Sequence, residues 1–398
     1  MRDALRALPS TVWVLGVISL LNDAASELVY PLLPLYLATV LGAGPRALGL
    51  IEGAAEAMSA LLKLVSGVWY DRVRRAKLFV VAGYGFAAIS RPLIALVGSW
   101  PMLLALRLLD RLGKGLRSSP RDALLARSVP AARRGAAFGL HRAFDNAGAV
   151  IGPLLAAGLL ALHVPLRDIL LWAAVPGALC VALALSLREP ANDAVVVATK
   201  PDWTWRGLPP GFRRMLIAIS VFTLGQASNA FVILRAHDLG MPAAQAALLW
   251  AAVAATSTLL ALPLSAHSDR VGRVPLLTIG WTLHAVLFVM LGWIDEVAFL
   301  WVAAILLGVY MAATEGSERA LIADLVPQER LGTAYGWYYL AKGLLLLPAS
   351  AVFGWLWVAS GPAVAFTLSA SLVALATLVL VTWVLPGVRD AHRRPEAR

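Results

Sequence analysis

Long apolar runs recur along almost the whole chain, separated by short polar segments. About 20 helical residues cross the hydrocarbon core of a bilayer, so runs of this length predict membrane-spanning helices. The uncharged stretch from Gly343 to Val388 is long enough for two crossings. Other windows without Asp, Glu, Lys or Arg cover residues 146–166, 169–187, 215–234, 239–268, 275–294 and 297–314. The pattern predicts a polytopic α-helical membrane protein.

The spacing of the runs predicts twelve transmembrane helices. The expected spans are 11–41, 46–69, 77–98, 101–126, 135–161 and 168–187, then 213–236, 242–267, 275–295, 297–325, 333–358 and 362–385. Between the two sets of six, residues 187–214 are rich in Pro, Asp, Asn and Arg, which end an apolar pattern. We therefore expect an all-α membrane protein with two pseudo-symmetric six-helix bundles, 1–187 and 213–398, joined by a cytoplasmic linker at 188–212. The C-terminal bundle includes a short cytoplasmic tail.

The two halves repeat each other in sequence. DRVRR at 71–75 matches DRVGR at 269–273, and RDALLARSVPAARRGAAFG from Arg121 matches ERALIADLVPQERLGTAYG from Glu318. The two matches lie 198 and 197 residues apart. Two independent matches at nearly one offset indicate a duplication, and parallel repeats of this kind are typical of membrane transporters.

Charge is scarce and unevenly distributed. The mean hydropathy is +0.76 and only 14% of residues are charged, with a net charge of +11. If the N-terminus is cytoplasmic, the outer segments hold only Arg46, Arg167 and Arg235, and the remaining loop cations lie inside. This positive-inside bias places both termini in the cytoplasm and excludes a nucleic-acid interface. The single cysteine, Cys180, excludes a disulfide framework. The N-terminal apolar stretch has no A-x-A cleavage site, so we expect a first transmembrane helix and not a signal peptide.

With these features, the chain resembles the major facilitator superfamily of secondary transporters, and specifically its proton-coupled exporters. The resemblance covers twelve spans, the duplication, the central loop and the segment GVWYDRVRR, which keeps Gly67, Asp71, Arg72 and Arg75 of the family pattern but has Arg74 in place of a glycine. It implies a monomer in the cell inner membrane that works by alternating access. It also implies that Asp71 and Arg72, with their repeats Asp269 and Arg270, set the gating equilibrium.

The segment DRLGKGLRSSPRDALLA at 110–126 concentrates charge in one predicted helix. Arg107, Asp110, Lys114, Arg117 and Arg121 follow a 3,4,3,4 spacing and so form one stripe along it. Charged groups inside a bilayer must face protein or water. Two interpretations stay open. Lys114, Arg117, Arg121 and Asp122 could form an ion-pair network that locks helices together, whereas Arg107, Asp110 and Arg111, deeper in the membrane, could also meet a charged substrate.

Carboxylates on the first two helices point to proton coupling. Asp23 and Glu27 are four residues apart, as are Glu52 and Glu56 and also His141 and Asp145. Neighbouring carboxylates cannot both stay ionised cheaply in a low-dielectric site, so one of each pair is expected to load and release a proton. The candidate proton or cation sites are Asp23, Glu27, Glu56 and Asp145. Permanent salt bridges to Arg107, Arg111 or Arg142 are the alternative, and Glu52 lies near the outer end of its helix, within reach of water.

A second gating element lies in the fifth predicted helix. Gly148, Gly152 and Pro153 approximate the G-x3-G-P-x2-G element that the superfamily's proton-coupled exporters carry, with Ala156 at the last position. Small residues allow close helix packing, and proline weakens the backbone ladder. The resemblance therefore favours export over import, although small-residue contacts occur in any helix bundle.

The remaining polar residues within the spans are candidates for the substrate cavity. Gln226 and Asn229 could donate to substrate or simply bond a neighbouring helix. Lys342 stands isolated and could bind an anionic group. His141 and Asp145 could bind a divalent ion, but a hydrogen bond inside the helix bundle is the favoured interpretation of this histidine. The full set of cavity candidates is Asn22, Tyr30, Arg107, Asp110, Arg111, His141, Arg142, Gln226, Asn229 and Lys342.

No phosphate loop, nucleophile elbow or metal-protease helix occurs in the sequence, so we expect no enzyme activity, no cofactor and no bound metal. The sequence predicts proton-coupled export of a small molecule. An importer or facilitator of a polar solute, an anionic solute or a divalent metal is the alternative, and a membrane enzyme or sensor is the remaining class. The expected partners are the substrate, protons and the lipid bilayer.

Overall fold

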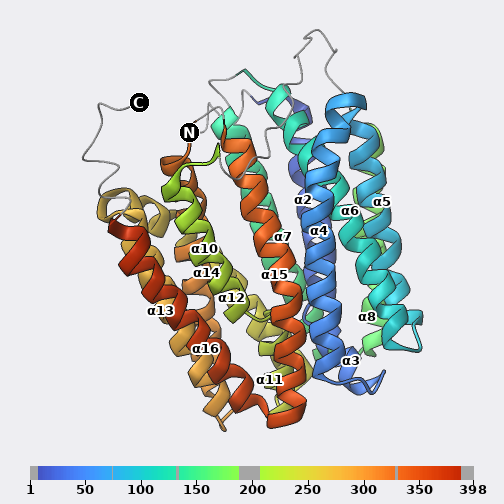
Figure 1. Ribbon diagram of the computed structural model, residues 1–398. Coiled ribbons are helices and arrows are strands. Elements are labelled where there is room, and N and C mark those ends of the chain that lie inside the picture. Colours follow the sequence, from blue (N-terminus) through green and yellow to red (C-terminus); the bar gives the residue numbers. More distant parts are fainter. Residues whose placement is uncertain (1–7, 74, 131–133, 188–206, 328–329, 387–398) are drawn as a thin grey trace. The chain divides into compact units, whose positions relative to one another are not determined.

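The computed structural model describes residues 8–73, 75–130, 134–187, 207–327 and 330–386. Long helices dominate this part of the chain (Figure 1). The first half contains α2 (Ser10–Val29), α3 (Leu32–Thr39), α4 (Pro45–Val73), α5 (Ala76–Leu93), η1 (Ile94–Leu96), α6 (Trp100–Arg127), α7 (Arg134–Ala161), α8 (Leu166–Trp172) and α9 (Ala174–Ser186). The second contains α10 (Pro210–Gly225), α11 (Ala230–Asp238), α12 (Ala243–Val271), α13 (Arg273–Trp293), α14 (Phe299–Leu325), α15 (Leu331–Ser360), α16 (Pro362–Val379) and the π-helical turn η5 (Leu380–Val384).

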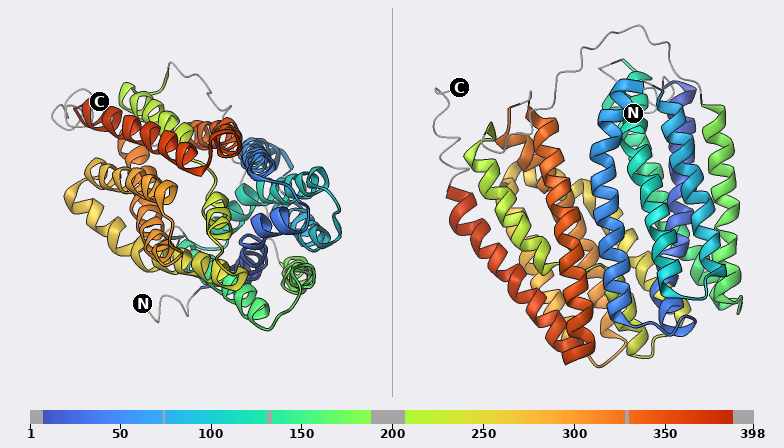
Figure 2. Two further views of the ribbon diagram at one scale, coloured as in Figure 1. Left: turned by 90° about the horizontal axis from the view of Figure 1, so that it is seen from below. Right: turned by 45° about the vertical axis from the view of Figure 1, so that its right-hand side comes forward.

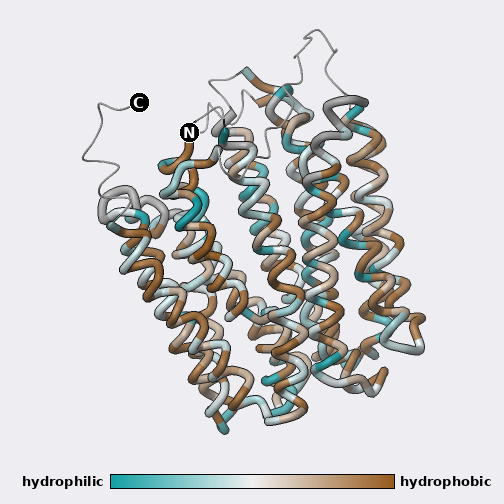
Figure 3. The backbone as a smooth tube through the Cα atoms, in the orientation of Figure 1, coloured by the Kyte–Doolittle hydropathy of each residue, from teal (hydrophilic) through white to brown (hydrophobic). Residues whose placement is uncertain are grey.

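The predicted twelve-span architecture is confirmed. Among the described residues, ten segments are long and apolar enough to cross a membrane. Helices α4 and α6, with 29 and 28 residues, have membrane-spanning length but carry the charges discussed below. Apolar residues run along the helices of both halves (Figure 3), and large side chains such as Leu96, Leu259 and Trp293 are exposed, as lipid contact requires.

Three of the predicted spans are interrupted, which the hydropathy pattern did not reveal. The first breaks between α2 and α3 at Tyr30 and Pro31, because proline has no N–H to continue the ladder. The sixth breaks between α8 and α9. The seventh is extended at Gln226, between α10 and α11. There the backbone N–H of Ser228 donates to Ser350 Oγ at 3.2 Å, so a side chain replaces a helical acceptor.

Contacts divide the chain into two compact units. Unit 1 comprises residues 1–43, 54–199 and 241–251, and unit 2 comprises residues 44–53, 200–240 and 252–398. The first turns of α4 therefore group with unit 2, and the first turns of α12 group with unit 1. The bundle boundaries that we expect at 1–187 and 213–398 stay a prediction, and most of the expected linker at 188–212 lies outside the described residues.

Each unit repeats the same helix pairing. In unit 1, α2 packs on α7 and α9, and α5 packs on α6 and α9. In unit 2, α10 packs on α15 and α16, and α13 packs on α14 and α16. Figures 1 and 2 show the pairs α5–α6 and α13–α16 side by side within their own units. The duplication seen in the sequence thus extends to the packing.

The apolar cores of the two units differ in composition. A mainly aliphatic cluster that includes Leu15, Val80, Leu125 and Cys180 lies in unit 1 between α2, α5, α6 and α9. In unit 2 the interior is aromatic: Phe222 stacks on Trp281 with centroids 4.4 Å apart, and further rings of α13, α15 and α16 continue the cluster. The polar residues considered below are set into these apolar surroundings.

Candidate functional site

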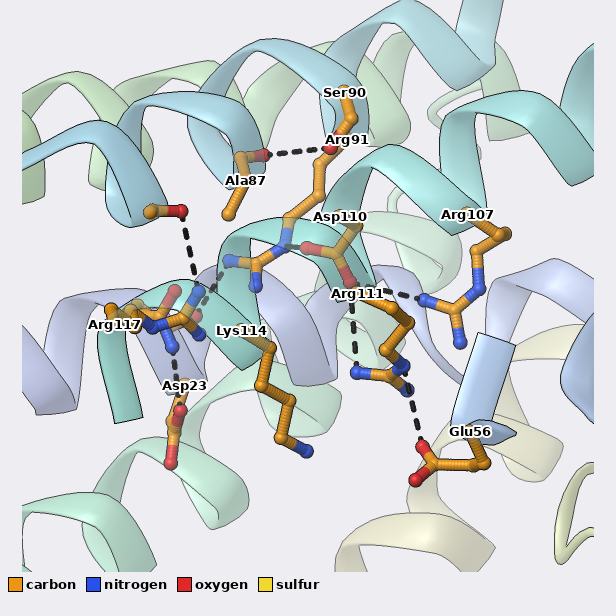
Figure 4. Close-up of polar contacts among 12 residues, drawn as sticks. Asp23, Glu56, Ala87, Ser90, Arg91, Arg107, Asp110, Arg111, Lys114 and Arg117 are labelled. Carbon is orange, nitrogen blue, oxygen red and sulfur yellow. Dashed lines mark hydrogen bonds and ion pairs between the residues drawn. The ribbon is translucent and has the colours of Figure 1, made fainter. Parts of the chain in front are cut away.

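Asp110 of α6 is the centre of a buried ion cluster in unit 1. Its Oδ1 lies 3.0 Å from Arg91 Nε, and its Oδ2 lies 3.5 Å from Arg107 Nη1 and 3.6 Å from Arg111 Nη1. The four side chains are at most 8% exposed. Figure 4 shows the Asp110 carboxylate among the three guanidinium groups. One carboxylate cannot neutralise three guanidinium groups, so the cluster depends on further acceptors.

Two further acceptors belong to the cluster. Arg111 Nε lies 3.3 Å from Glu56 Oε1, which joins α6 to α4. Arg91 Nη1 donates to the backbone oxygen of Asn22 at 2.9 Å, which joins α5 to α2. Glu56 is therefore held by the salt bridge that the sequence left open as an alternative to a proton site. The arrangement fixes the relative positions of four helices within unit 1.

The rest of the α6 stripe has mixed partners. Arg117 is buried, with its guanidinium carbon 4.6 Å from the centre of the Tyr84 ring and Nη1 3.4 Å from the carbonyl of Gly83. Arg121 pairs with its neighbour Asp122 at 2.9 Å. Lys114 forms no ion pair with a described residue, although Arg111, Glu56, Asp23 and Arg117 act on it electrostatically. Figure 4 shows its ammonium group without a polar contact to the other residues drawn.

Asp23 and Glu27 of α2 contact neutral donors. Asp23 Oδ1 accepts a hydrogen bond from Asn22 Nδ2 at 2.8 Å. Glu27 Oε2 accepts one from the indole Nε1 of Trp250 at 2.8 Å, and the Trp250 ring lies 4.9 Å from that of Tyr30. Neither carboxylate has an ion pair with a basic side chain in the described part of the chain. For Asp23 and Glu27, the described residues therefore provide no salt bridge, which was the alternative to a proton site.

Asp145 of α7 lies in a more polar setting. Ser19 Oγ of α2 donates a hydrogen bond to its Oδ1. Its Oδ2 lies 3.6 Å from His141 Nδ1 and 3.9 Å from Arg142 Nη1. The Asp145 side chain is 14% exposed, whereas Arg142 is 53% exposed and so contributes a weak, screened interaction. The i,i+4 pair of His141 and Asp145 predicted from the sequence is thus confirmed.

The glycines of α7 allow close contact with α2. A Cβ on Gly148 would lie 2.5 Å from the backbone oxygen of Leu20, and one on Gly152 would lie 2.6 Å from that of Ala24. Both glycines face the backbone turns that carry Asp23 and Glu27. Pro153 lies inside α7, as predicted. The small-residue motif therefore brings α7 against the carboxylate-bearing helix.

Unit 2 has its own polar cluster on α14 and α15. Glu318 is 1% exposed. Its Oε2 accepts a hydrogen bond from Tyr338 Oη at 2.6 Å and one from Lys342 Nζ at 2.9 Å. Lys342 Nζ also lies 3.3 Å from Tyr338 Oη. The expectation that Lys342 is isolated is therefore wrong: its partner is one helix away, and no sequence spacing shows that contact.

The two amide candidates of the seventh span differ in their partners. Gln226 Nε2 donates to Tyr310 Oη at 3.2 Å, the interhelical bond that the sequence left as an alternative. Asn229 precedes α11, and its Oδ1 is buried without a hydrogen-bond partner among the described residues. A buried acceptor of this kind is available to a donor that the chain does not supply.

Most of the predicted gating motif cannot be placed. The side chains of Asp71, Arg72, Asp269 and Arg270 and the surroundings of Gly67 lie outside the described residues. Arg75 is described, and it is exposed immediately before α5. The gating role of this motif stays a prediction.

Comparison with known proteins agrees with this architecture. The profile of the Major Facilitator Superfamily matches residues 15–223 and 214–398. The chain is 32% identical over 386 residues to an uncharacterized MFS-type transporter of Methanocaldococcus jannaschii, covering 94% of this chain and 95% of that protein. This protein belongs to the Major Facilitator Superfamily.

Two further comparisons add detail on relatives and fold. The multidrug resistance protein MdtG of Klebsiella pneumoniae is 25% identical over 303 residues, covering 72% of each chain. The crystal structure of a single-substitution mutant of the nucleoside transporter NupG superposes with a TM-score of 0.80 at 14% identity, covering 93% of this chain and 99% of that one. A POT family transporter superposes with a TM-score of 0.79 at 13% identity, covering 97% and 99%. These likenesses to solved structures show the fold alone.

As a member of the superfamily, the protein is a multi-pass membrane transporter of small molecules. Sequence reasoning missed the Trp250 contact to Glu27 and the Ser19 contact to Asp145, because both join residues far apart in the chain. Glu318 was not among the candidate residues predicted from the sequence. The internal repeat could have drawn attention to Glu318, because it occupies the position of Arg121.

Proposed function

We propose that this transporter is a proton-coupled exporter of a small molecule that works by alternating access. In this proposal the chain resides in the cell inner membrane as a monomer with both termini in the cytoplasm. Asp23 and Glu27 bind and release the coupling proton, and Asp145 assists them. The likeness to a multidrug resistance protein supports export, as does the small-residue motif of α7.

The observation that carries the proposal is the contrast between two kinds of carboxylate in unit 1. Asp110 and Glu56 are held by arginines, so their charge is already compensated. Among the described residues, the side chains that donate hydrogen bonds to Asp23 and Glu27 are neutral. A carboxylate inside a membrane protein without a counter-ion is neutralised most cheaply by a proton. These two groups therefore suit reversible protonation, whereas Asp110 and Glu56 suit structural roles.

The proposal is tested in proteoliposomes that contain a pH-sensitive dye. Candidate drugs and metabolites are added to the protein, and proton movement is followed across an imposed pH gradient. A substrate of an exporter drives protons in the direction opposite to its own movement, and cells that express the protein accumulate less of it. Accumulation that rises on expression, with protons moving alongside the solute, would contradict export.

A second candidate function is proton-coupled import of an anionic solute. The observation that favours it is the pairing of Glu318 with Lys342 in unit 2, because that pair offers a proton acceptor and a cation together. The dye experiment separates the two candidates by the relative direction of proton and solute.

A further inference from the structure

The internal repeat aligns residues of the polar cluster in unit 2 with polar residues of unit 1. The 197-residue offset that aligns Gly139 with Gly336 also aligns Arg121 with Glu318. On the helix that follows, it aligns His141 with Tyr338 and Asp145 with Lys342. No insertion separates these positions from the aligned glycines, because α7 and α15 are continuous through them.

The equivalent positions carry opposite charges. In unit 1 the cation is on α6 (Arg121) and the acid is on α7 (Asp145), and the two interact electrostatically. In unit 2 the acid is on α14 (Glu318) and the cation is on α15 (Lys342). One turn before the charge on α7 or α15, each unit has a ring that can form hydrogen bonds. The ring is His141 on α7, before Asp145, and Tyr338 on α15, before Lys342. The duplicated framework has therefore been kept while its polarity has been reversed.

The two charges of the unit 2 pair differ in exposure. In unit 2 the carboxylate of Glu318 is sealed, at 2% side-chain exposure, whereas the Lys342 side chain is 31% exposed. Lys342 lies within the candidate membrane span 333–360, where a charged group must face protein or water and not lipid. An ammonium group has three N–H donors, and the described residues supply two acceptors, Glu318 and Tyr338. One donor remains for a ligand.

The protonation state of Glu318 determines whether that ligand can be an anion. While Glu318 is ionised, the pair is neutral and an incoming anion would meet the carboxylate beside the ammonium group. When Glu318 takes a proton from water, its charge is removed and Lys342 becomes an uncompensated cation. An anion then restores neutrality. The charge of the site is zero before and after, provided that one proton and one monoanion bind together.

We propose that Glu318, Tyr338 and Lys342 form a proton-dependent binding subsite for the carboxylate or phosphate group of a substrate. Glu318 accepts the proton, Lys342 binds the anionic group and Tyr338 orients both. The inference rests on the proposed proton coupling but not on its direction. Other described titratable side chains of unit 2 on helices packed here are Arg46 and Glu52 of α4, Arg213 and Arg214 of α10, His267 of α12, Arg273 and His284 of α13, Tyr310, Glu315, Arg319 and Asp324 of α14, and Tyr335 and Tyr339 of α15. Of these, Tyr310 and Glu315 act electrostatically on Lys342.

The test measures anion binding to the purified full-length protein, without the need for a known substrate. Acetate, benzoate and inorganic phosphate are titrated at constant ionic strength, at acidic and at mildly alkaline pH, and thermal stabilisation gives an apparent affinity. For a monoanion, binding of one proton per anion predicts that the affinity falls about tenfold per pH unit on the alkaline side. Failure of all three probes to stabilise the wild-type protein at either pH would overturn the proposal.

Variants separate the roles of the two charged residues. Glu318→Gln should bind the probe equally well at both pH values, because the side chain is neutral throughout. Lys342→Gln should no longer be stabilised by the probes at either pH. Glu315→Gln, the matched control, removes a half-exposed carboxylate one turn away and should keep the wild-type pH dependence. Unchanged pH dependence in Glu318→Gln, or unchanged affinity in Lys342→Gln, would contradict the assignment.

A neutral double variant covers the case in which a single variant does not fold. Glu318→Gln with Lys342→Gln leaves no unpaired buried charge, so it should fold and should bind none of the probes. Probe binding by this variant equal to that of the wild type would refute the subsite. The proposed exporter mechanism is tested separately, since substitutions of Asp23 in unit 1 should leave probe binding in unit 2 intact.

Discussion

The indole N–H of Trp250 donates a hydrogen bond to Glu27 across 223 residues of sequence. This bond provides the carboxylate with a donor but not with a positive charge. It is therefore compatible with a group that alternates between ionised and protonated forms, unlike the arginine contacts of Asp110.

Replacement of Trp250 by phenylalanine tests this contact. Trp250→Phe keeps an aromatic ring beside Tyr30 and removes only the N–H donor. Because a hydrogen bond to a charged group contributes about 1.5–3 kcal/mol, we expect proton-coupled flux to change by roughly tenfold or more. Flux is measured in proteoliposomes with a pH-sensitive dye. Trp13→Phe, which alters an indole that packs edge-on against Phe144, is the control and should transport normally.

Asp23→Asn should abolish coupled transport without unfolding the protein. The amide keeps the size and the hydrogen-bonding capacity of the side chain but cannot exchange a proton. Dye-reported proton flux gives the transport result, and thermal unfolding gives the stability result. Asp238→Asn makes the same chemical change at a 38% exposed side chain at the end of α11 and should affect neither. Wild-type flux driven by pH in Asp23→Asn would remove Asp23 from the mechanism.

Asp110→Asn should destabilise unit 1 strongly. The substitution leaves Arg91, Arg107 and Arg111 buried without their shared carboxylate. Removal of one partner from a buried ion pair typically costs about 3–5 kcal/mol, so a large fall in the thermal unfolding temperature is expected. Asp122→Asn, at a 49% exposed side chain paired with Arg121, should cost at most about 1 kcal/mol. Equal effects of the two substitutions would show that the cluster is not structural.

Gly152→Ala should impair both folding and transport, because its methyl group would lie within 2.7 Å of the Ala24 oxygen and the Leu28 nitrogen. Helix α7 would have to move away from α2 by a fraction of an ångström or more. Gly158→Ala, two turns further along α7, meets no atom within 4 Å and should be tolerated. Expression level, unfolding temperature and flux are compared for the pair. Equal tolerance of both alanines would show that close α2–α7 contact is dispensable.

The sequence predicted the helices well and the contacts among them poorly. Twelve spans follow from hydropathy because each must satisfy its own backbone in lipid, and this constraint is local. The breaks at Pro31 and Gln226 and the pairing of Lys342 depend on neighbours that no local pattern specifies. The stripe on α6 was visible as a spacing. Which of its residues form ion pairs, as Asp110 does, depends on contacts with α2, α4 and α5.

Only the structure separates the carboxylates of the first two spans into those with a basic partner and those with neutral hydrogen-bond donors. Asp23, Glu27 and Glu56 look equivalent in sequence, each in an i,i+4 acidic pair. Glu56 has a guanidinium partner from α6, whereas Asp23 and Glu27 have neutral donors. Spacing along one helix identifies a shared face, but the identity of the partner comes from another helix.

The reversed polarity of the repeat makes the two halves chemically unequal. A chain assembled from two copies of the first half would carry the arginine and the aspartate of 121 and 145 twice, and it would lack an ammonium group at 342. The acid–ammonium pair of unit 2 is therefore a property of the second half alone, and a doubled first half would not reproduce it.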